Sequence, residues 1–202
     1  MNEDPYARAA LLVVDVQQAF DEPTLVPRNN PACDDNIDAL VRAWSAASRP
    51  LVYVQHHSTE AGSPLRPDSP GSALKPYLTA EPDLLVTKSV NSSFHGTPDL
   101  DAWLHDNDVT ALVVCGITTN HCCETTARVG ANLGHEVLFA IDATHTFDRT
   151  GPDGITVPAD TLAQVTAANL HGEFADVVTT ASLLSTTRPE AARVGSRATA
   201  TT

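Results

Sequence analysis

Short apolar segments recur along the chain and are separated by segments of helical length. Within each one, apolar residues follow one another instead of alternating with polar residues. This pattern is typical of strands buried on both faces of a parallel sheet. The predicted strands cover residues 10–16, 50–56, 83–88, 109–116, 135–142 and 175–180. The predicted helices cover about residues 34–48, 98–106, 120–134, 158–171 and 181–185.

The alternation of strands and helices predicts an α/β fold: a three-layer α/β/α sandwich around a six-stranded, mostly parallel sheet of Rossmann-like topology. A chain of 202 residues suffices for one full core, so we expect one domain over residues 1–185. The segment 57–82 is rich in Pro, Gly and Ser and too long for a simple connection, which predicts an ordered loop near the functional site. Residues 186–202 have few apolar side chains to bury and are predicted to form a flexible tail.

The net charge of -13 argues against nucleic acid or an anionic membrane surface as a partner, and is compatible with a cationic ligand. The first residues carry no basic segment, and their apolar run of about eight residues is too short for a signal peptide or a membrane span. We therefore expect a cytoplasmic protein whose four cysteines are reduced. Of these, Cys115 is predicted to be a buried strand residue and Cys33 an incidental thiol before a helix.

Chemically active residue types follow several of the predicted strands. In an open parallel sheet, ligands bind outside the carboxyl ends of the strands. Asp15 follows the first strand, His56 and His57 the second, and Lys88 the third, while the fourth leads into the turn GITTNHCC. An Asp and a Lys near a cysteine can set its protonation state. The alternative for Asp15 is a turn cap, and for Lys88 a packed stem with its ammonium in water.

Cys122 and Cys123 are adjacent at the start of the predicted helix 120–134. Cys123 shares a helix face with small residues such as Ala127 and Gly130, so it is predicted to pack on the sheet. Cys122 is rotated by about 100° from it, toward the strand ends. In the first turn of a helix, free N–H groups and the helix dipole lower the pKa of a thiol and can hold an oxyanion. Because helix starts are defined only to within a residue or two, helical phase alone leaves Cys123 open.

The cysteine pair has three alternative uses. A vicinal disulfide is strained and disfavoured in a reducing compartment. A thiol redox protein using Cys122 and Cys123 is the alternative of a different class. A zinc site lacks any C-x-x-C or H-x-x-x-H spacing and is also disfavoured. Its candidate ligands are His56, His57, His121, Cys122 and Cys123.

Three motifs, in this order, resemble those of the isochorismatase-like cysteine hydrolases. They are D-x-Q-x-x-F beginning at Asp15, K-x-x-x-S-x-F beginning at Lys88, and G-I-x-T-N-x-C-x-E-x-T-A containing Cys122. The resemblance spans about residues 9–185. In that family the thiol before the x-E-x-T-A element is the nucleophile, which here is Cys122. The next position is commonly Val and is here Cys123.

The resemblance implies a cysteine-dependent hydrolase that cleaves a C–N bond of a small molecule, in an amide, lactam or carbamoyl group, through a thioester. Asp15, Lys88 and Cys122 would form the catalytic triad, with Asp15 as the base. The backbone N–H groups of Thr118 and Cys122 would form the oxyanion hole, and the peptide between Ile117 and Thr118 would be cis. Further pocket residues implied by position are Gln17, Phe20, His57, Phe94 and His121.

This chain differs from some family members at sequence positions that matter for a metal, and we expect an enzyme without a metal or cofactor. Nicotinamidases carry an Asp-x-His metal element after the second strand, where this chain reads QHHSTEAGSP. Isochorismatase-type ether hydrolases, the alternative within the family, often replace the cysteine that this chain retains. The segments ATHTFDR (143–149) and TAANLHGEFA (166–175) look like those of streptothricin hydrolases, which open a lactam in a basic antibiotic. Relatives commonly form a homodimer or homotetramer, so an oligomer is expected.

Overall fold

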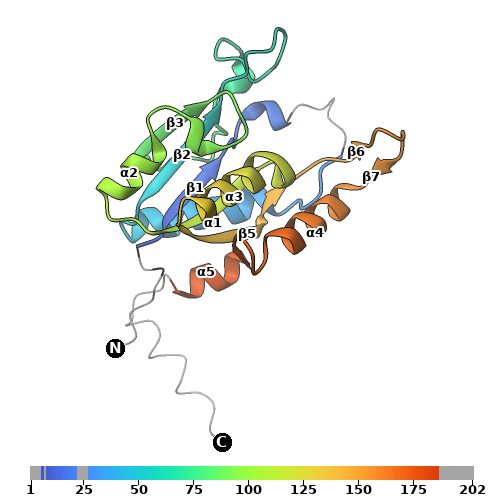
Figure 1. Ribbon diagram of the computed structural model, residues 1–202. Coiled ribbons are helices and arrows are strands. Elements are labelled where there is room, and N and C mark those ends of the chain that lie inside the picture. The colour runs from blue at the N-terminus through green and yellow to red at the C-terminus, as the bar shows by residue number, and fades with distance from the viewer. Residues whose placement is uncertain (1–5, 7, 22–26, 187–202) are drawn as a thin grey trace, which may run out of the picture.

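A computed structural model of the chain describes residue 6, residues 8–21 and residues 27–186. Six strands form one sheet in the order β3-β2-β1-β4-β5-β8, and every neighbouring pair is parallel (Figure 1). This confirms the predicted fold class, while the predicted tail falls almost entirely outside the described residues. The strands are β1 (Ala10–Val14), β2 (Leu51–His56), β3 (Leu84–Lys88), β4 (Ala111–Ile117), β5 (Glu136–His145) and β8 (Asp176–Val178).

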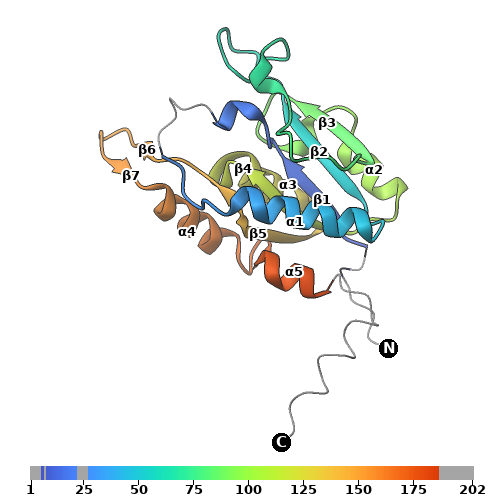
Figure 2. The same ribbon diagram turned by 180° about the vertical axis from the view of Figure 1, so that it is seen from behind.

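Helices cover both faces of the sheet. One face carries α1 (Cys33–Ala46) and α5 (Thr180–Thr186), which lie in front in Figure 2. The other carries α2 (Leu100–Asp106), α3 (Glu124–Asn132) and α4 (Ala159–Leu170), in front in Figure 1. None of the helices in the described part of the chain is long and apolar enough to cross a membrane.

The apolar strands are explained by the two cores that the sheet separates. Leu11 and Val13 of β1 belong to the core beneath α1. Leu12 and Val14 belong to the core beneath α2 and α3. Alternate side chains of a strand point to opposite faces, so a strand covered on both sides must be apolar at every position.

The structure differs from the predicted elements in the turn after β4 and in a hairpin, among other short elements. The predicted helix over 120–134 begins as a π-helical turn, η4 (Thr119–Cys123), and becomes α-helical only from Glu124. A hairpin of two-residue strands, β6 (Arg149–Thr150) and β7 (Thr156–Val157), was not predicted. Each of its strands is too short and too polar to leave a period-two pattern.

The loop over residues 57–82 is ordered, as predicted, and a buried lysine anchors it to α1. The Lys75 ammonium donates to Asp21 Oδ1 at 2.7 Å and to Asp34 Oδ1 at 3.0 Å, and Tyr77 donates to the same Asp34 oxygen at 2.9 Å. The Lys75 side chain is 2% exposed. Two carboxylates around one buried ammonium fix the loop against the helix layer.

Strands β1 and β4 are neighbours at the point where the strand order reverses. Strands β2 and β3 lie on the β1 side of this point, and β5 and β8 lie on the β4 side. Such a switch point is where ligands bind in open parallel sheets. Gly116 of β4 pairs with Val14 of β1 and has φ of 126°. A Cβ atom at Gly116 would overlap the carbonyl oxygen of Val14. Only glycine lets the two strands approach this closely at the ligand-binding edge.

We predict that Gly116→Ala lowers the free energy of unfolding by at least about 3 kcal/mol, because it adds a backbone overlap to an unfavourable positive φ. Urea denaturation measures the change. Gly154→Ala is the matched control, since Gly154 also has a positive φ of 81° but nothing lies within 4 Å of its added Cβ. Equal losses in the two variants would contradict the role assigned to Gly116.

Candidate active site

A buried ion pair joins the ends of β1 and β3. Asp15 follows β1 with a left-handed backbone, φ of 52°, that turns the chain away from the sheet. Lys88 is the last residue of β3, and its Nζ donates to Asp15 Oδ2 at 2.6 Å. The two side chains are 1% and 0% exposed. The lysine stem therefore crosses the end of the intervening strand β2 to reach the carboxylate.

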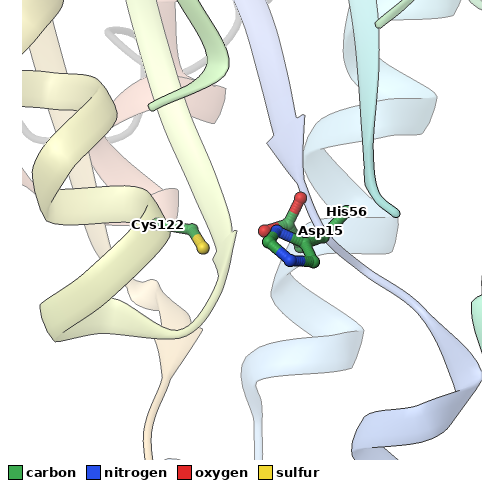
Figure 3. A group of neighbouring side chains, drawn as sticks. All are labelled: Asp15, His56 and Cys122. Atoms are coloured by element: carbon green, nitrogen blue, oxygen red, sulfur yellow. The ribbon is translucent and has the colours of Figure 1, made fainter. Parts of the chain in front are cut away.

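Cys122 reaches the same place from the turn after β4. Its Sγ and one ligand-type atom each of Asp15 and His56 all lie within 4.8 Å of one another. Figure 3 shows the sulfur directed across the gap toward Asp15 and His56. The thiol is partly buried and donates weakly to Asn91 Oδ1 at 3.7 Å. The structure thus brings together the three residues predicted to form the triad.

One oxygen of this carboxylate has no partner. Lys88 satisfies Asp15 Oδ2, whereas Oδ1 is buried without a hydrogen bond among the described residues. Buried carboxylate oxygens are normally paired, so an exception calls for an explanation. An unpaired acceptor beside a thiol is suited to take a proton.

His56 is the site residue that the sequence analysis did not select. Its Nδ1 lies 3.3 Å from Lys88 Nζ, and because an ammonium can only donate, Nδ1 is the acceptor. Burial, and secondarily the charge of Lys88, lowers the pKa of His56, which favours the neutral ring. Successive side chains of a strand point to opposite faces, so only one of His56 and His57 can face the site, and the sequence pattern does not say which one.

Gln17 holds His56 in place and is not free to contact a substrate through its amide. Its Oε1 accepts from His56 N at 2.9 Å, and its Nε2 donates to Ser72 O at 2.7 Å and to His56 O at 3.1 Å. The predicted pocket residue is therefore a brace between β2 and the loop over 57–82.

The other predicted pocket residues are dispersed. His57 is partly buried and donates its backbone N–H to Lys88 O at 2.7 Å. Phe20 stacks on Phe147, with ring centroids 6.4 Å apart. Phe94 stacks on His135 at 5.7 Å and lies against Gly130 of α3.

His121, next to the nucleophile candidate, contacts a cation. Arg149 Nη2 lies 3.1 Å from His121 Nδ1. Burial and this guanidinium lower the pKa of His121. A neutral imidazole and an arginine thus stand at the rim beside Cys122.

The pKa of Cys122 is raised to about 12, which corrects the expectation that the helix start lowers it. Burial is the largest cause and the negative charge of Asp15 adds to it, while Lys88 opposes both. An exposed thiol in the first turn of an α-helix would have a lowered pKa, whereas the partly buried thiol of Cys122 lies in a π-turn beside a carboxylate. The resting thiol is therefore protonated and needs a base.

The remaining cysteines are packing residues. Cys33, Cys115 and Cys123 are 0% exposed, and all four cysteines are free thiols. Cys123 lies in the core beneath α3 with Ala127, as its helix face predicted. Burial raises the pKa of Cys123 well above its ordinary value.

The turn between β4 and α3 folds around one carbonyl. The peptide between Ile117 and Thr118 is cis, and Thr118 O accepts from His121 N at 3.2 Å and from Cys123 N at 3.3 Å. These bonds fix the backbone that carries the predicted oxyanion-hole residues Thr118 and Cys122.

Asp15, His56 and Cys122 are also residue types that bind metals. The Lys88 ammonium already lies 2.6 Å from Asp15 and 3.3 Å from His56. A metal cation would have to displace or repel this charge, so the arrangement fits a charge-paired base better than a metal centre.

A fully buried histidine, His145, lies near the site on the α1 face of the sheet. His145 ends β5, is 0% exposed and touches Phe147 edge-on, with centroids 5.3 Å apart. Neither ring nitrogen has a partner among the described residues. Burial, with the charges of Arg28 and Lys75, lowers its pKa from 6.5 to about 3.

The chain is similar in sequence and in structure to known proteins of one family. The sequence profile of the Isochorismatase domain matches residues 9–182. The isochorismatase family protein YrdC of Bacillus subtilis (strain 168) is 36% identical over 178 residues, covering 88% of this chain and 95% of that protein. A streptothricin hydrolase of Streptomyces noursei is 38% identical over 156 residues, 74% of this chain and 60% of that protein. An isochorismatase-family crystal structure from Chromobacterium violaceum ATCC 12472 has a TM-score of 0.85 and 38% identity, covering 90% of this chain and 94% of that one.

We predict that Lys88→Met lowers the free energy of unfolding by about 3–5 kcal/mol, because it leaves the Asp15 carboxylate buried and unpaired. The double variant Asp15→Asn/Lys88→Met removes both charges and should lose less than the sum of the single variants, as measured by urea denaturation. Arg42→Ala is a control, since its pair with Asp38 is largely exposed and is worth less than about 1 kcal/mol. Additive losses at Asp15 and Lys88 would contradict the coupling.

We predict that His145 causes a loss of stability in acid. A pKa lowered on folding means that the unfolded chain binds the proton first, so stability is present above pH 6.5 and is lost as pH falls toward 3. Between pH 7 and pH 4.5 this group accounts for about 2–3 kcal/mol. His145→Leu should remove that part of the pH dependence in urea denaturation, whereas the exposed His95→Leu should keep it. An unchanged slope in His145→Leu would show that other groups titrate.

Proposed function

Because the chain belongs to the isochorismatase family of hydrolases, we propose that it uses Cys122 to cleave a C–N bond of a small molecule through a thioester intermediate. The substrate would carry an amide, lactam or carbamoyl group. The observation that carries the proposal is the unpaired Oδ1 of Asp15 beside a protonated thiol.

The first step is proton transfer within this pair. A thiol with a pKa of about 12 is almost wholly protonated at neutral pH, so attack requires a base in place. Asp15 Oδ1 is buried and unpaired among the described residues, and the Asp15 carboxylate is in the same cluster as the sulfur. Asp15 would accept the proton as Cys122 Sγ attacks the carbonyl carbon.

The tetrahedral intermediate would then place its oxyanion at the N–H groups of Thr118 and Cys122, each such donor contributing about 3 kcal/mol in comparable sites. As the C–N bond breaks, Asp15 returns the proton to the leaving nitrogen. Water next attacks the thioester with Asp15 again as the base. The products are the carboxylic or carbamic acid and the amine, and the thiol is restored.

Lys88 and His56 would support this cycle without entering it. Lys88 Nζ, 2.6 Å from Asp15 Oδ2, stabilises the carboxylate that must act as base. With its Nδ1 accepting from Lys88, a neutral His56 carries its proton on Nε2. Removal of the Lys88 side chain would leave Asp15 Oδ2 without its hydrogen-bond donor.

The redox alternative is disfavoured by the burial of the second thiol. Cys123 is 0% exposed in the core, and burial holds its pKa well above the ordinary value. Redox-active thiols are usually exposed and of low pKa. The retained Cys122 likewise argues against an ether hydrolase that works without a nucleophile.

The charges beside the thiol give no preference for a cationic substrate. Arg149 stands against His121 at the rim, although the chain as a whole carries -13. Local charges decide recognition at a site more than the net charge does. We therefore propose a neutral amide-type group at the reacting centre.

We predict that Cys122→Ala loses at least about 10³-fold in kcat/KM on every amide that the wild type cleaves, because the nucleophile is removed. The measurement is release of ammonia or amine from a panel of amides, carbamoyl compounds and lactams. Cys123→Val is the matched control: it keeps the packing volume and should retain activity within a few-fold.

Full activity of Cys122→Ala would overturn the proposal. Loss of activity in Cys123→Val with a native melting temperature would assign the chemistry to the pair and favour the redox alternative.

A further inference from the structure

A second group of side chains of metal-ligating types lies near the amino-terminal end of β5, whereas Cys122 lies after the carboxyl end of β4. Asp101 and His105 come from α2, and His135 lies directly before β5. One ligand-type atom of each lies within 4.8 Å of the others. We propose that these three residues bind a divalent transition-metal ion such as Zn²⁺.

The helix supplies two of the ligands because their spacing is i,i+4, which puts both side chains on one face. His105 Nδ1 lies 3.6 Å from Asp101 Oδ1. Pairs at this spacing on a helix are a recurring way of chelating a metal.

The third ligand is positioned by the end of α3. Gly134 has φ of 96°, and His135 N donates to Gly130 O at 3.0 Å, which closes the helix and turns the chain toward α2. His135 Nε2 then lies 2.8 Å from Asp101 Oδ1, and its side chain is 5% exposed. Phe94 stacks on one side of the ring and His105 meets it edge-on.

The spacing of these atoms suits a tetrahedral ion. With bonds of about 2.0–2.1 Å, ligand atoms around Zn²⁺ lie about 3.3 Å from one another. The observed separations of 2.8 and 3.6 Å bracket that distance. His105 Nδ1 also lies 2.9 Å from the Asp101 carbonyl oxygen, so the His105 ring must give up this hydrogen bond to bind the ion through Nδ1. Two imidazoles and one carboxylate are a ligand set that Zn²⁺ accepts, with water in the fourth position.

The two histidines of the cluster border a cavity that Asp101 does not line. A cavity of about 180 Å³ borders His105 and His135, and Asp108 also lines it. No lysine or arginine is among the described residues that line this cavity. This differs from the catalytic cluster, where Lys88 lies between the candidate ligands.

Bound at this position, the ion would tie α2 to the turn between α3 and β5. In its absence, the Asp101–His135 hydrogen bond and the edge-on contact of His105 with His135 make that link. The metal would add a coordination bond from His105, whose side chain is 67% exposed.

The test is a Zn²⁺ titration of the full chain in the Cys122→Ser background, which removes the accessible thiol as a competing ligand. We expect one equivalent of Zn²⁺ in isothermal titration calorimetry and a rise in melting temperature at saturating Zn²⁺. His105→Ala should weaken the affinity at least about tenfold, since even loss of an outer-shell partner costs about 10–100-fold. Substituted Co²⁺ should give the visible absorption of a tetrahedral site.

His95→Ala is the matched control, because His95 is an exposed histidine outside the cluster, and it should change the affinity less than about twofold. His105→Ala keeps the Asp101–His135 hydrogen bond, so a native melting temperature without zinc shows that it folds. Zinc binding that is absent, or that is equal in the two alanine variants, would overturn the proposal.

Discussion

The buried pair of Asp15 and Lys88 is the interaction on which the rest of the site depends. Each ion loses several kcal/mol of solvation when it is taken out of water, and only a short, well-directed contact can offset that loss. At 2.6 Å, with side chains 1% and 0% exposed, the pair meets this condition for one carboxylate oxygen. The other oxygen remains unpaired among the described residues, and the carboxylate lies in one cluster with Cys122. The same contact thus pairs one oxygen of Asp15 and leaves the other as an unused acceptor.

The fold makes this contact possible by bringing four strand ends to one edge. Asp15 follows β1, and Lys88 reaches it past His56 at the end of β2. Cys122 comes from the far side of the switch point, over a strand that Gly116 allows to lie close to β1. The burial that gives the ion pair its strength also raises the pKa of the thiol, so the two effects cannot be separated. A protonated thiol beside a charged base is the result.

Much of this arrangement could be predicted from the sequence. Continuous apolar runs located the strands to within a few residues, as for 83–88 against Leu84–Lys88. The small face of the helix assigned Cys123 to the core. The motifs selected Asp15, Lys88 and Cys122, which the fold does bring together.

The rest depended on contacts between distant segments. The choice of His56 over His57 depends on Gln17 and on Ser72, 55 residues further along the chain. The π-turn has no propensity signature that separates it from an α-helix start. The raised pKa of Cys122 follows from three-dimensional burial, which the helix-start argument left out. Asp101 and His135 are 34 residues apart, so no local sequence spacing predicts their contact.

The most direct test of the central claim is the mass of the chain trapped by acid during its first turnover of a cleavable amide, followed by peptide mapping. The account predicts an added mass equal to the acyl part of the substrate, carried by the peptide that contains Cys122 and located on that residue. An acyl group on another residue, or turnover in which the chain stays unmodified at times that resolve the first cycle, would contradict it.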